Sequence, residues 1–328
     1  MATIKKILIA IIFLPFSSYA DQLSFLLYND YFAGTDRYFT NGVAFIWLNE
    51  QKRPDDSDTW TIDYVENNPF YKLKKNKSYT FGISFTHIMI TPADVLKQTT
   101  QYDDIPYAAH AGLSFNLYQW DKTSFKEFRV ELGSFGPRAY GEEAQNNWHD
   151  FINKERSEGW DTQLENQGTI NSTLRYGKIS YQGEISNYLK SDWFNQAGLE
   201  LGNFETDFFI SSIYRIGNNY PLNFNVHYPY LKEEASLLKI QKNPPSFGWS
   251  LNTGINAKLI HYSYVTDEAK QQNYNITKRV AQGSLYFGLD LFYQNHKLIS
   301  FYQYQSPYIK ESSDTHTLGG FMYSYNFK

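Results

Sequence analysis

The sequence predicts an all-β protein, a transmembrane antiparallel β-barrel of about twelve strands with a short helix in an extracellular loop. Three observations support this prediction. The chain begins with an export leader, and its later segments alternate apolar and polar residues. Aromatic residues make up 18% of a sequence whose mean hydropathy is −0.53. No later segment has the ~18 consecutive apolar residues of a membrane helix, so the aromatic content suits strands that face lipid.

The first 20 residues have the three parts of a signal peptide. Lys5 and Lys6 form a positive start, Ile7 to Phe16 an apolar run too short to span a bilayer, and Ser18 to Ala20 the small-residue cleavage site. We expect cleavage after Ala20, which leaves residues 21–328 as one outer-membrane β-barrel domain. An uncleaved inner-membrane anchor is the alternative.

The charge and the cysteine count narrow the class of partner. The formal net charge is −4, and removal of the leader takes away two lysines and no acid. This mild acidity argues against a nucleic-acid partner and fits a chain that needs divalent cations or only stays soluble in transit. Cysteine is absent, so an exported chain of this kind is not held together by disulfides.

Alternation with a period of two is the main structural signal. Leu285, Phe287 and Leu289 fall on one face, opposite Ser284 and Asp290, as a strand between lipid and lumen requires. A soluble β-sandwich or a lipocalin-like fold is the alternative. Twelve such segments begin near Leu23, Phe39, Ser78, Ile105, Ser124, Gly168, Phe194, Phe204, Phe247, Val280, Lys297 and Thr315.

An even number of strands returns both termini to the periplasm. The connections 1–2, 3–4, 5–6 and 7–8 then lie outside the cell, and 5–6, from about Gly136 to Gln167, is the longest of these. The segment from Gln51 to Lys77 would be periplasmic, where turns are normally short, and the sequence gives no physical reason for its length.

The 5–6 connection contains a predicted helix from Glu142 to Glu155. Ala144, Trp148, Phe151 and Ile152 recur at helical spacing, and Glu142 and Glu143 lie in the first turn, where the helix dipole favours negative charge. Gln145 and His149 are four residues apart and therefore share one face. A charged helix that only caps a loop is the structural alternative.

Polar residues in the other exterior connections favour a hydrolytic site. Strand 1 ends in Asn29-Asp30, strand 2 opens with Thr35 to Gly42, and the 3–4 connection carries Lys97 and Tyr102 to Ala108. Hydrolysis requires a base, an orienting partner and a positive centre for the oxyanion. Solvated turns are the alternative interpretation.

The parity of strand 1 predicts where such a site faces. Leu23, Phe25 and Leu27 form its apolar face, and Asn29 continues the same parity. With regular pleating Asn29 points toward lipid near the outer leaflet, and Asp30 faces inward unless a bulge intervenes.

These segments resemble the lipid A 3′-O-deacylase family of outer-membrane barrels, the LpxR-like proteins. The resemblance extends from about Leu23 to the end, but its specific motifs precede Gln167. They are Asn29-Asp30, Asp36-Arg37-x-x-Thr40-x-Gly42, Thr91-Pro92 with Lys97, Gly136-Pro137 followed by Gln145-Asn146-x-x-His149, and Trp160-x-x-Gln163-Leu164.

The resemblance implies a monomeric enzyme of the Gram-negative outer membrane. Its site would face the outer leaflet and use Ca²⁺ to hydrolyse the ester of the 3′-acyloxyacyl group of lipid A in lipopolysaccharide. It implies His149 as the general base with Gln145 beside it. Asn29, Asp30 and Thr40 would help to hold the cation and the water, with Glu155 as a further metal or supporting residue. Lys97 would contact the scissile carbonyl or a lipid phosphate.

Two other functions remain open at this point. An outer-membrane phospholipase would need an activated serine, and Ser134 is the candidate at the end of strand 5, although no motif places a base beside it. A porin or an adhesin would need no such set of polar residues on one rim. We assign no role to the remaining histidines, which are His87, His110, His227, His261, His296 and His316.

Overall fold

The computed structural model describes residues 20–33, 38–51, 77–225, 234–238 and 246–327. Residues 1–19 of the expected signal peptide, Asp36-Arg37, residues 52–76 of the insertion and His227 lie outside these ranges, whereas Ala20 is the first residue of β1. The described residues form twelve strands, whose bounds are β1 Ala20–Asn29, β2 Tyr38–Asn49, β3 Ser78–Thr91, β4 Ala108–Trp120, β5 Ser124–Phe135, β6 Gln167–Glu184, β7 Lys190–Gly202, β8 Glu205–Asn218, β9 Gly248–Ser263, β10 Ala281–Tyr293, β11 His296–Gln305 and β12 His316–Asn326.

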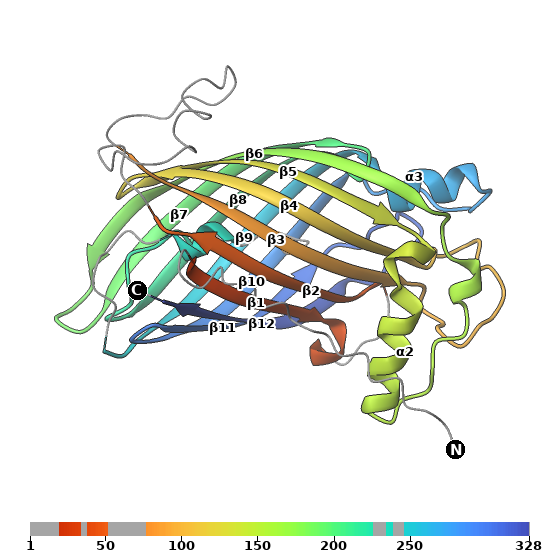
Figure 1. Cartoon of the computed structure of the whole chain (residues 1–328), viewed down its shortest axis with the longest axis horizontal. Helices are drawn as coiled ribbons and strands as arrows, with labels where there is room; N and C mark the ends of the chain where they lie inside the picture. Colours follow the sequence, from red (N-terminus) through yellow and green to blue (C-terminus); the bar gives the residue numbers. More distant parts are fainter. Residues whose placement is uncertain (1–19, 34–37, 52–76, 226–233, 239–245, 328) are drawn as a thin grey trace.

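Each strand pairs antiparallel with its sequence neighbours, and β1 pairs with β12 to close the barrel (Figure 1). The predicted fold and strand count are therefore confirmed. β4 begins at Ala108 and not near Ile105, because Pro106 has no N–H for the ladder. β7 begins four residues before the predicted Phe194.

The two ends of the barrel differ in their connections. One end carries the helices α2 (Gly141–Phe151) and α3 (Tyr264–Gln271) and the short 3₁₀ turns η2 (Asp30–Ala33), η3 (Pro137–Ala139) and η4 (Trp160–Thr162). At the other end β10 and β11 are joined by only two residues. Long loops outside and short turns inside are typical of outer-membrane barrels, so α2 and α3 mark the extracellular end. Among the described residues, no helix is long and apolar enough to cross a membrane.

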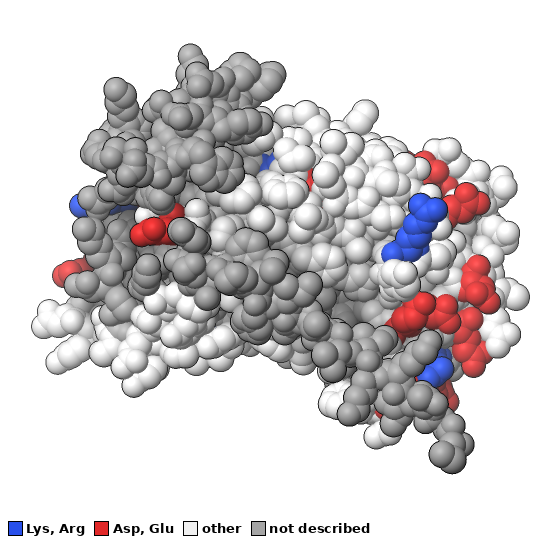
Figure 2. Space-filling view, in the orientation of Figure 1, with Lys and Arg blue, Asp and Glu red and all other residues white. Residues whose placement is uncertain are grey.

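The outer wall is apolar between its two ends. Charged side chains on the face in Figure 2 gather mainly at the end with α2, and the uncovered middle of the wall is nearly free of them. A surface of this kind is stable only against lipid. The outward side chains of the band include Phe45, Phe85, Leu113, Leu132, Leu174, Leu251, Ile255, Leu285 and Phe287, all of them exposed.

The lumen is packed at the periplasmic end. The segment after β8 enters the barrel, where the Phe224 ring lies 5.0 Å from Phe125 and 6.0 Å from Phe194. The turn η5 (Glu234–Leu237) adds buried Ala235 and Leu237 to the same core. Within the described residues this part of the barrel is filled with side chains, which argues against an open aqueous channel.

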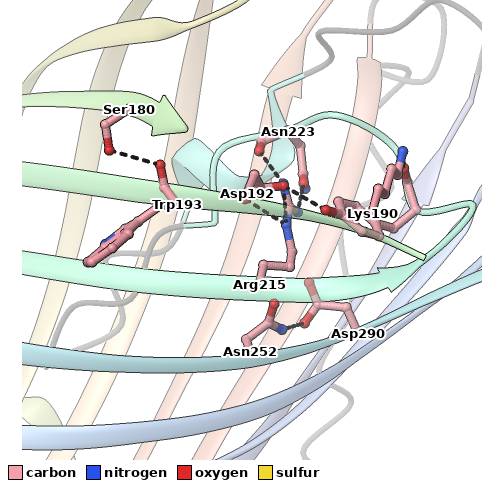
Figure 3. A network of polar contacts seen from close by, with 9 residues as sticks. Ser180, Lys190, Asp192, Trp193, Arg215, Asn223, Asn252 and Asp290 are labelled. Atoms are coloured by element: carbon pink, nitrogen blue, oxygen red, sulfur yellow. Dashed lines mark hydrogen bonds and ion pairs between the residues drawn. The ribbon is translucent and has the colours of Figure 1, made fainter. Parts of the chain in front are cut away.

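A charged network fixes that segment to the wall, and we call Asp192, Arg215, Tyr220 and Asn223 the Arg215 network (Figure 3). Arg215 Nη2 donates to Asp192 Oδ2 at 2.8 Å and to the Asn223 carbonyl at 3.0 Å. The Tyr220 hydroxyl donates to Asp192 Oδ2 at 2.9 Å. Arg215 and Asp192 are fully buried, so a complete set of bonds compensates their desolvation.

Candidate active site on the outer wall of the barrel

A β-bulge shapes the extracellular end of β2. The register with β3 passes from Phe39 opposite Ile90 to Asn41 opposite Met89, so Thr40 is the extra residue. Because a bulge reverses the alternation, Phe39 turns into the lumen, where its ring meets Tyr28 at 6.2 Å. The Thr40 hydroxyl lies 2.6 Å from the hydroxyl of Thr91 on the neighbouring strand.

Asn29, Asn41 and Met89 form one row across three strands, since Asn29 is opposite Asn41 and Asn41 is opposite Met89. Asn29 has the parity of the half-exposed Leu27 and therefore lies on the outer side of the wall. Its side chain is nevertheless only 5% exposed. Another element covers this stretch of wall, and that element is α2.

A small apolar cluster outside the barrel holds α2 in place. Met89, Tyr107 and Ala109 of the wall region pack with Ala139 and Trp160 of the 5–6 connection. Gly141 begins α2, and a Cβ there would lie 2.4 Å from the Ala109 Cβ. Only glycine therefore lets the helix start this close to the wall.

The end of α2 places a carbonyl next to His149. The predicted helix runs to Glu155, but the observed helix ends at Phe151. Asn153 has φ 54°, the left-handed conformation that terminates helices. The Lys154 N–H then donates to the His149 carbonyl at 2.8 Å. This Schellman turn folds the chain back, so that the Glu155 carbonyl lies 2.6 Å from His149 Nδ1.

His149 and Gln145 share one face of α2, as their spacing predicts, and the structure turns that face to the barrel wall, with exposures of 2% and 1%. A carbonyl oxygen only accepts, so His149 Nδ1 is the donor of this hydrogen bond, and Nε2 is the acceptor nitrogen of the corresponding tautomer. The Trp160 indole N–H donates to Gln145 Oε1 at 2.7 Å. Gln145 Nε2 is buried and has no hydrogen-bond partner among the described residues.

We call the space between α2 and the strands the wall crevice, and it measures about 280 Å³. It brings together four of the six predicted catalytic residues, from β1, β2 and α2. Its lining consists of Asn29, Thr40, Asn41, Met89, Gln145, Trp148, His149, Ile152 and Lys154.

Three predicted site residues lie elsewhere. Asp30 follows Asn29 and is fully buried, but it does not line the crevice. Lys97 lines a separate hollow at the rim. Glu155 meets His149 through its main chain, and its side chain is exposed. The side chains of Glu155 and Lys97 therefore do not line the wall crevice.

Asn41 and Lys154 line the crevice although the sequence did not single them out as site residues. In the sequence, the Asn41-Gly42 pair is typical of a turn. The strand register shows that Asn41 lies opposite Asn29. The sequence predicts Lys154 inside a longer helix. In the structure, the turn after α2 brings Lys154 back beside His149. To identify Asn41 and Lys154 as site residues, the strand register and the end of α2 have to be known, and local sequence patterns do not give either.

The apolar stripe of α2 is divided between the wall and the exposed side of the helix. Ala144 packs against the cluster on the wall, and Ile152 lines the crevice. Phe151 is 77% exposed and Trp148 is 36% exposed, with ring centroids 5.7 Å apart. The polar residues Gln145 and His149 also face the wall. Exposed aromatic residues at the extracellular end of a barrel are typical of the lipid interface. The crevice is thus bounded by a helix that faces the outer leaflet.

The donor types around the crevice fit a hard, oxygen-liganded cation. Asn29 and Asn41 supply amide groups, Thr40 a hydroxyl, and Asp30 a neighbouring buried carboxylate. Asn41 Oδ1 has no hydrogen-bond partner among the described residues. Calcium accepts such mixed oxygen ligands. No group of three or more histidine, cysteine, aspartate or glutamate residues in the described ranges could hold a metal.

These features define the class of protein: an outer-membrane β-barrel whose candidate site lies on the lipid-facing side of its wall. A family model described as "Outer membrane protein LpxR" matches residues 7–327, and the chain belongs to that family. The resemblance and the location predicted from the sequence are thereby confirmed. Membership supports a lipid A deacylase of the outer membrane, with the lipid A of lipopolysaccharide as its substrate.

Two solved structures are similar. "LpxR from Salmonella typhimurium" aligns with a TM-score of 0.74 and 13% identity over 93% of this chain and 99% of that chain. The β domain of the Bordetella autotransporter BrkA aligns with a TM-score of 0.47 and 8% identity over 94% and 99%. The first alignment shows that the two chains share a fold. The TM-score of the second alignment is too low to support a conclusion. No curated protein matches the chain.

Proposed function

We propose that this protein is a calcium-dependent hydrolase that cleaves the ester of the 3′-acyloxyacyl group of lipid A with water as the nucleophile. The observation that carries the proposal is the contact between His149 Nδ1 and the Glu155 carbonyl, inside a crevice on the outer wall. It leaves Nε2 as the acceptor, and an acceptor nitrogen is what a general base requires.

His149 takes the proton from the attacking water. The Glu155 carbonyl fixes the tautomer and holds the plane of the ring, as the partner of a catalytic histidine commonly does. Because the carbonyl belongs to the turn that ends α2, the orientation of the base depends on that turn. No serine nucleophile is needed on this route.

Gln145 supplies the donor for the oxyanion. The Trp160 N–H occupies Gln145 Oε1 and so fixes which end of the amide remains for a ligand. The remaining Nε2 group is a buried donor one helical turn from His149. A preorganised donor of this kind stabilises the charge of a tetrahedral intermediate. Lys154 provides positive charge at the same crevice, where the resemblance implies Lys97 as the residue that contacts the scissile carbonyl or a lipid phosphate.

Calcium is implied by the resemblance and fits the donors at the end of β1 and the start of β2. Asp30, Asn29 and Thr40 would hold it, with Asn41 as an additional oxygen donor. When bound, it would polarise the ester carbonyl. The resemblance implies Glu155 as a further ligand, but its carboxylate is exposed and does not line the crevice.

Access from the membrane fits an acylated substrate. Asn29 and Asn41 lie on the lipid side of the wall, and the aromatic rings of Trp148 and Phe151 extend the apolar surface over α2. Acyl chains can therefore stay in the leaflet while the ester enters the crevice. The protein therefore needs no enclosed pocket to hold the acyl chains.

No specific contact supports the alternative functions, a phospholipase or a porin. The Ser134 hydroxyl donates to the Phe135 carbonyl at 3.2 Å, and no described histidine contacts it. The packed periplasmic end of the lumen does not favour a porin.

The test is incubation of the purified barrel in detergent with hexa-acylated lipid A, with calcium or with a chelator, followed by mass spectrometry. We expect loss of one 3′-acyloxyacyl mass only when calcium is present. Phospholipid is supplied in parallel, and release of its fatty acid would favour a phospholipase. Intact lipid A with a correctly folded barrel would refute the proposed reaction, and chelator-resistant cleavage would refute the metal.

A further inference from the structure

A second cavity opens at the extracellular rim, and we call it the rim hollow. It measures about 930 Å³ and lies between the start of β2, the 3–4 connection and the 11–12 connection. Its lining includes Tyr38, Lys97, Gln101, Tyr102, Asp103 and Glu311. The hollow is thus separate from the wall crevice in its residues and larger in volume.

Hydrogen bonds between three loops hold the hollow open. The Asn275 N–H donates to the Tyr102 carbonyl at 2.7 Å, and its amide donates to Asp103 Oδ1 at 3.0 Å. The Thr277 N–H donates to Glu311 Oε2 at 2.8 Å. The 9–10 connection therefore joins the 3–4 and 11–12 connections. Walls that are fixed in this way lose little entropy when a ligand binds.

The side chains suit a ligand rich in hydroxyl groups. Tyr102 is 48% exposed and is supported by Tyr274, whose ring centroid lies 5.3 Å away at a steep angle. A fixed aromatic ring offers an apolar face, while Gln101, Asp103 and Glu311 offer acceptors. Sugars present both a C–H face and hydroxyl donors, and therefore match this combination.

The charge of the hollow disfavours a bare phosphate. Asp103, Asp104 and Glu311 outnumber Lys97, the basic residue of the lining. Burial acts to raise the pKa of Glu311, but hydrogen bonds from Thr277 outweigh it and hold the pKa below its usual value. Ionised carboxylates accept hydrogen bonds from hydroxyl groups and repel anions.

The hollow adjoins the wall crevice through β2, because Tyr38 lines the hollow and Thr40, two residues later, lines the crevice. We propose that the rim hollow is a saccharide subsite, which holds sugar of the lipopolysaccharide head group while the acyl ester lies under α2. The choice of this saccharide rests on the proposed function. The acyl chains then stay along the outer wall, and the sugar projects away from the membrane over the rim.

The test uses the full-length barrel in detergent and the lipid-free core oligosaccharide released from lipopolysaccharide by mild acid. Isothermal titration calorimetry compares the wild type with Tyr102→Leu, which removes the polar edge and the stacking ring, and with Glu311→Gln. Tyr188→Leu is the matched control, because Tyr188 is 78% exposed in the turn between β6 and β7 at the opposite end. We expect saturable binding that weakens about tenfold in Tyr102→Leu and not in the control.

A second measurement compares the KM for lipopolysaccharide with the KM for lipid A that lacks the core oligosaccharide. In Tyr102→Leu the ratio of the two constants should rise about tenfold. Absence of oligosaccharide binding to the wild type, or equal binding by Tyr102→Leu, would overturn the saccharide subsite. So would competition by inorganic phosphate alone. Because the titration needs no hydrolysis, an inactive enzyme that binds the sugar would refute the proposed function and leave the subsite intact.

Discussion

Two of the buried polar regions of the barrel, the Arg215 network and the wall crevice, lie at opposite ends and differ in how completely their groups are bonded. In the Arg215 network at the periplasmic end, each nitrogen of the guanidinium group has an acceptor, and both carboxylate oxygens of Asp192 have donors. In the wall crevice, Gln145 Nε2 and Asn41 Oδ1 have no partner among the described residues.

This difference in bonding suggests that the Arg215 network stabilises the fold and that the wall crevice binds a ligand. A buried polar group without a partner costs free energy, of the order of 1–3 kcal/mol. A fully bonded network avoids that cost and closes the lumen. A ligand that bonds with the unpartnered groups beside His149 would remove this cost. The predictions below test this distinction.

The largest effect is expected for His149→Ala. Removal of the general base should lower kcat by about 10²- to 10⁴-fold, because proton transfer from water loses its acceptor. The measurement is the rate of lipid A deacylation by mass spectrometry, with exposed His261→Ala as the control. Unchanged activity of His149→Ala would place the base elsewhere.

In the other region, Arg215→Ala should destabilise the barrel by about 3–5 kcal/mol, because Asp192 becomes a buried charge without its partner. Unfolding in detergent micelles measures the loss. The double variant Arg215→Met with Asp192→Leu is the control and should recover most of the stability, since it removes both charges. The kcat of the folded fraction should stay unchanged, and a large drop in kcat would couple the two regions.

Two substitutions of Gln145 separate its roles. Gln145→Glu keeps an oxygen for the Trp160 N–H but loses the amide donor, so we expect kcat to fall about 10²-fold with little change in KM. Gln145→Leu should also leave the Trp160 N–H unbonded and cost roughly 1–3 kcal/mol of stability. Equal activity of Gln145→Glu and wild type would exclude the amide as an oxyanion donor.

A smaller effect is expected at Asp121, in the turn between β4 and β5. Burial would raise its pKa, but hydrogen bonds from Thr123 and Ser124 and the Lys77 ammonium lower it to about 2. Because the folded pKa lies below the unfolded value of ~3.9, the stabilisation is present above pH 4 and disappears as the pH falls through 2.

The Asp121 side chain is 36% exposed and its ion pair is screened by solvent, so Asp121→Asn should cost no more than ~1 kcal/mol at pH 7. Unfolding free energies of the two proteins should converge as the pH falls from 4 to 2. A difference that persists at pH 2 would mean that the carboxylate charge is not the cause.

The smallest effect is expected for Glu155→Ala. The carbonyl that contacts His149 remains in this variant, and the exposed side chain is lost, so kcat should change by less than about threefold. Deacylation is measured across a calcium titration, with Glu158→Ala in the same loop as the control. A large rise in the calcium concentration needed for activity would restore Glu155 as a metal ligand.

The sequence by itself determined the barrel, the number and approximate start of its strands, and the pairing of Gln145 with His149 on one face. These features follow from local periodicities of two and 3.6 residues. It also gave the family, through motifs on alternate connections. The parity of Leu23 to Asn29 predicted correctly that Asn29 faces outward.

The tertiary structure decided which residues meet. The bulge at Thr40 and the strand register bring Asn41 to Asn29, and the left-handed Asn153 ends α2 early, so that the Glu155 carbonyl and Lys154 reach His149. It also turned the polar face of α2 to the wall and put Lys97 in the rim hollow. Side-chain periodicity is set along the chain, but contacts between strands and loops depend on register and chain reversal, which are fixed only when the barrel closes.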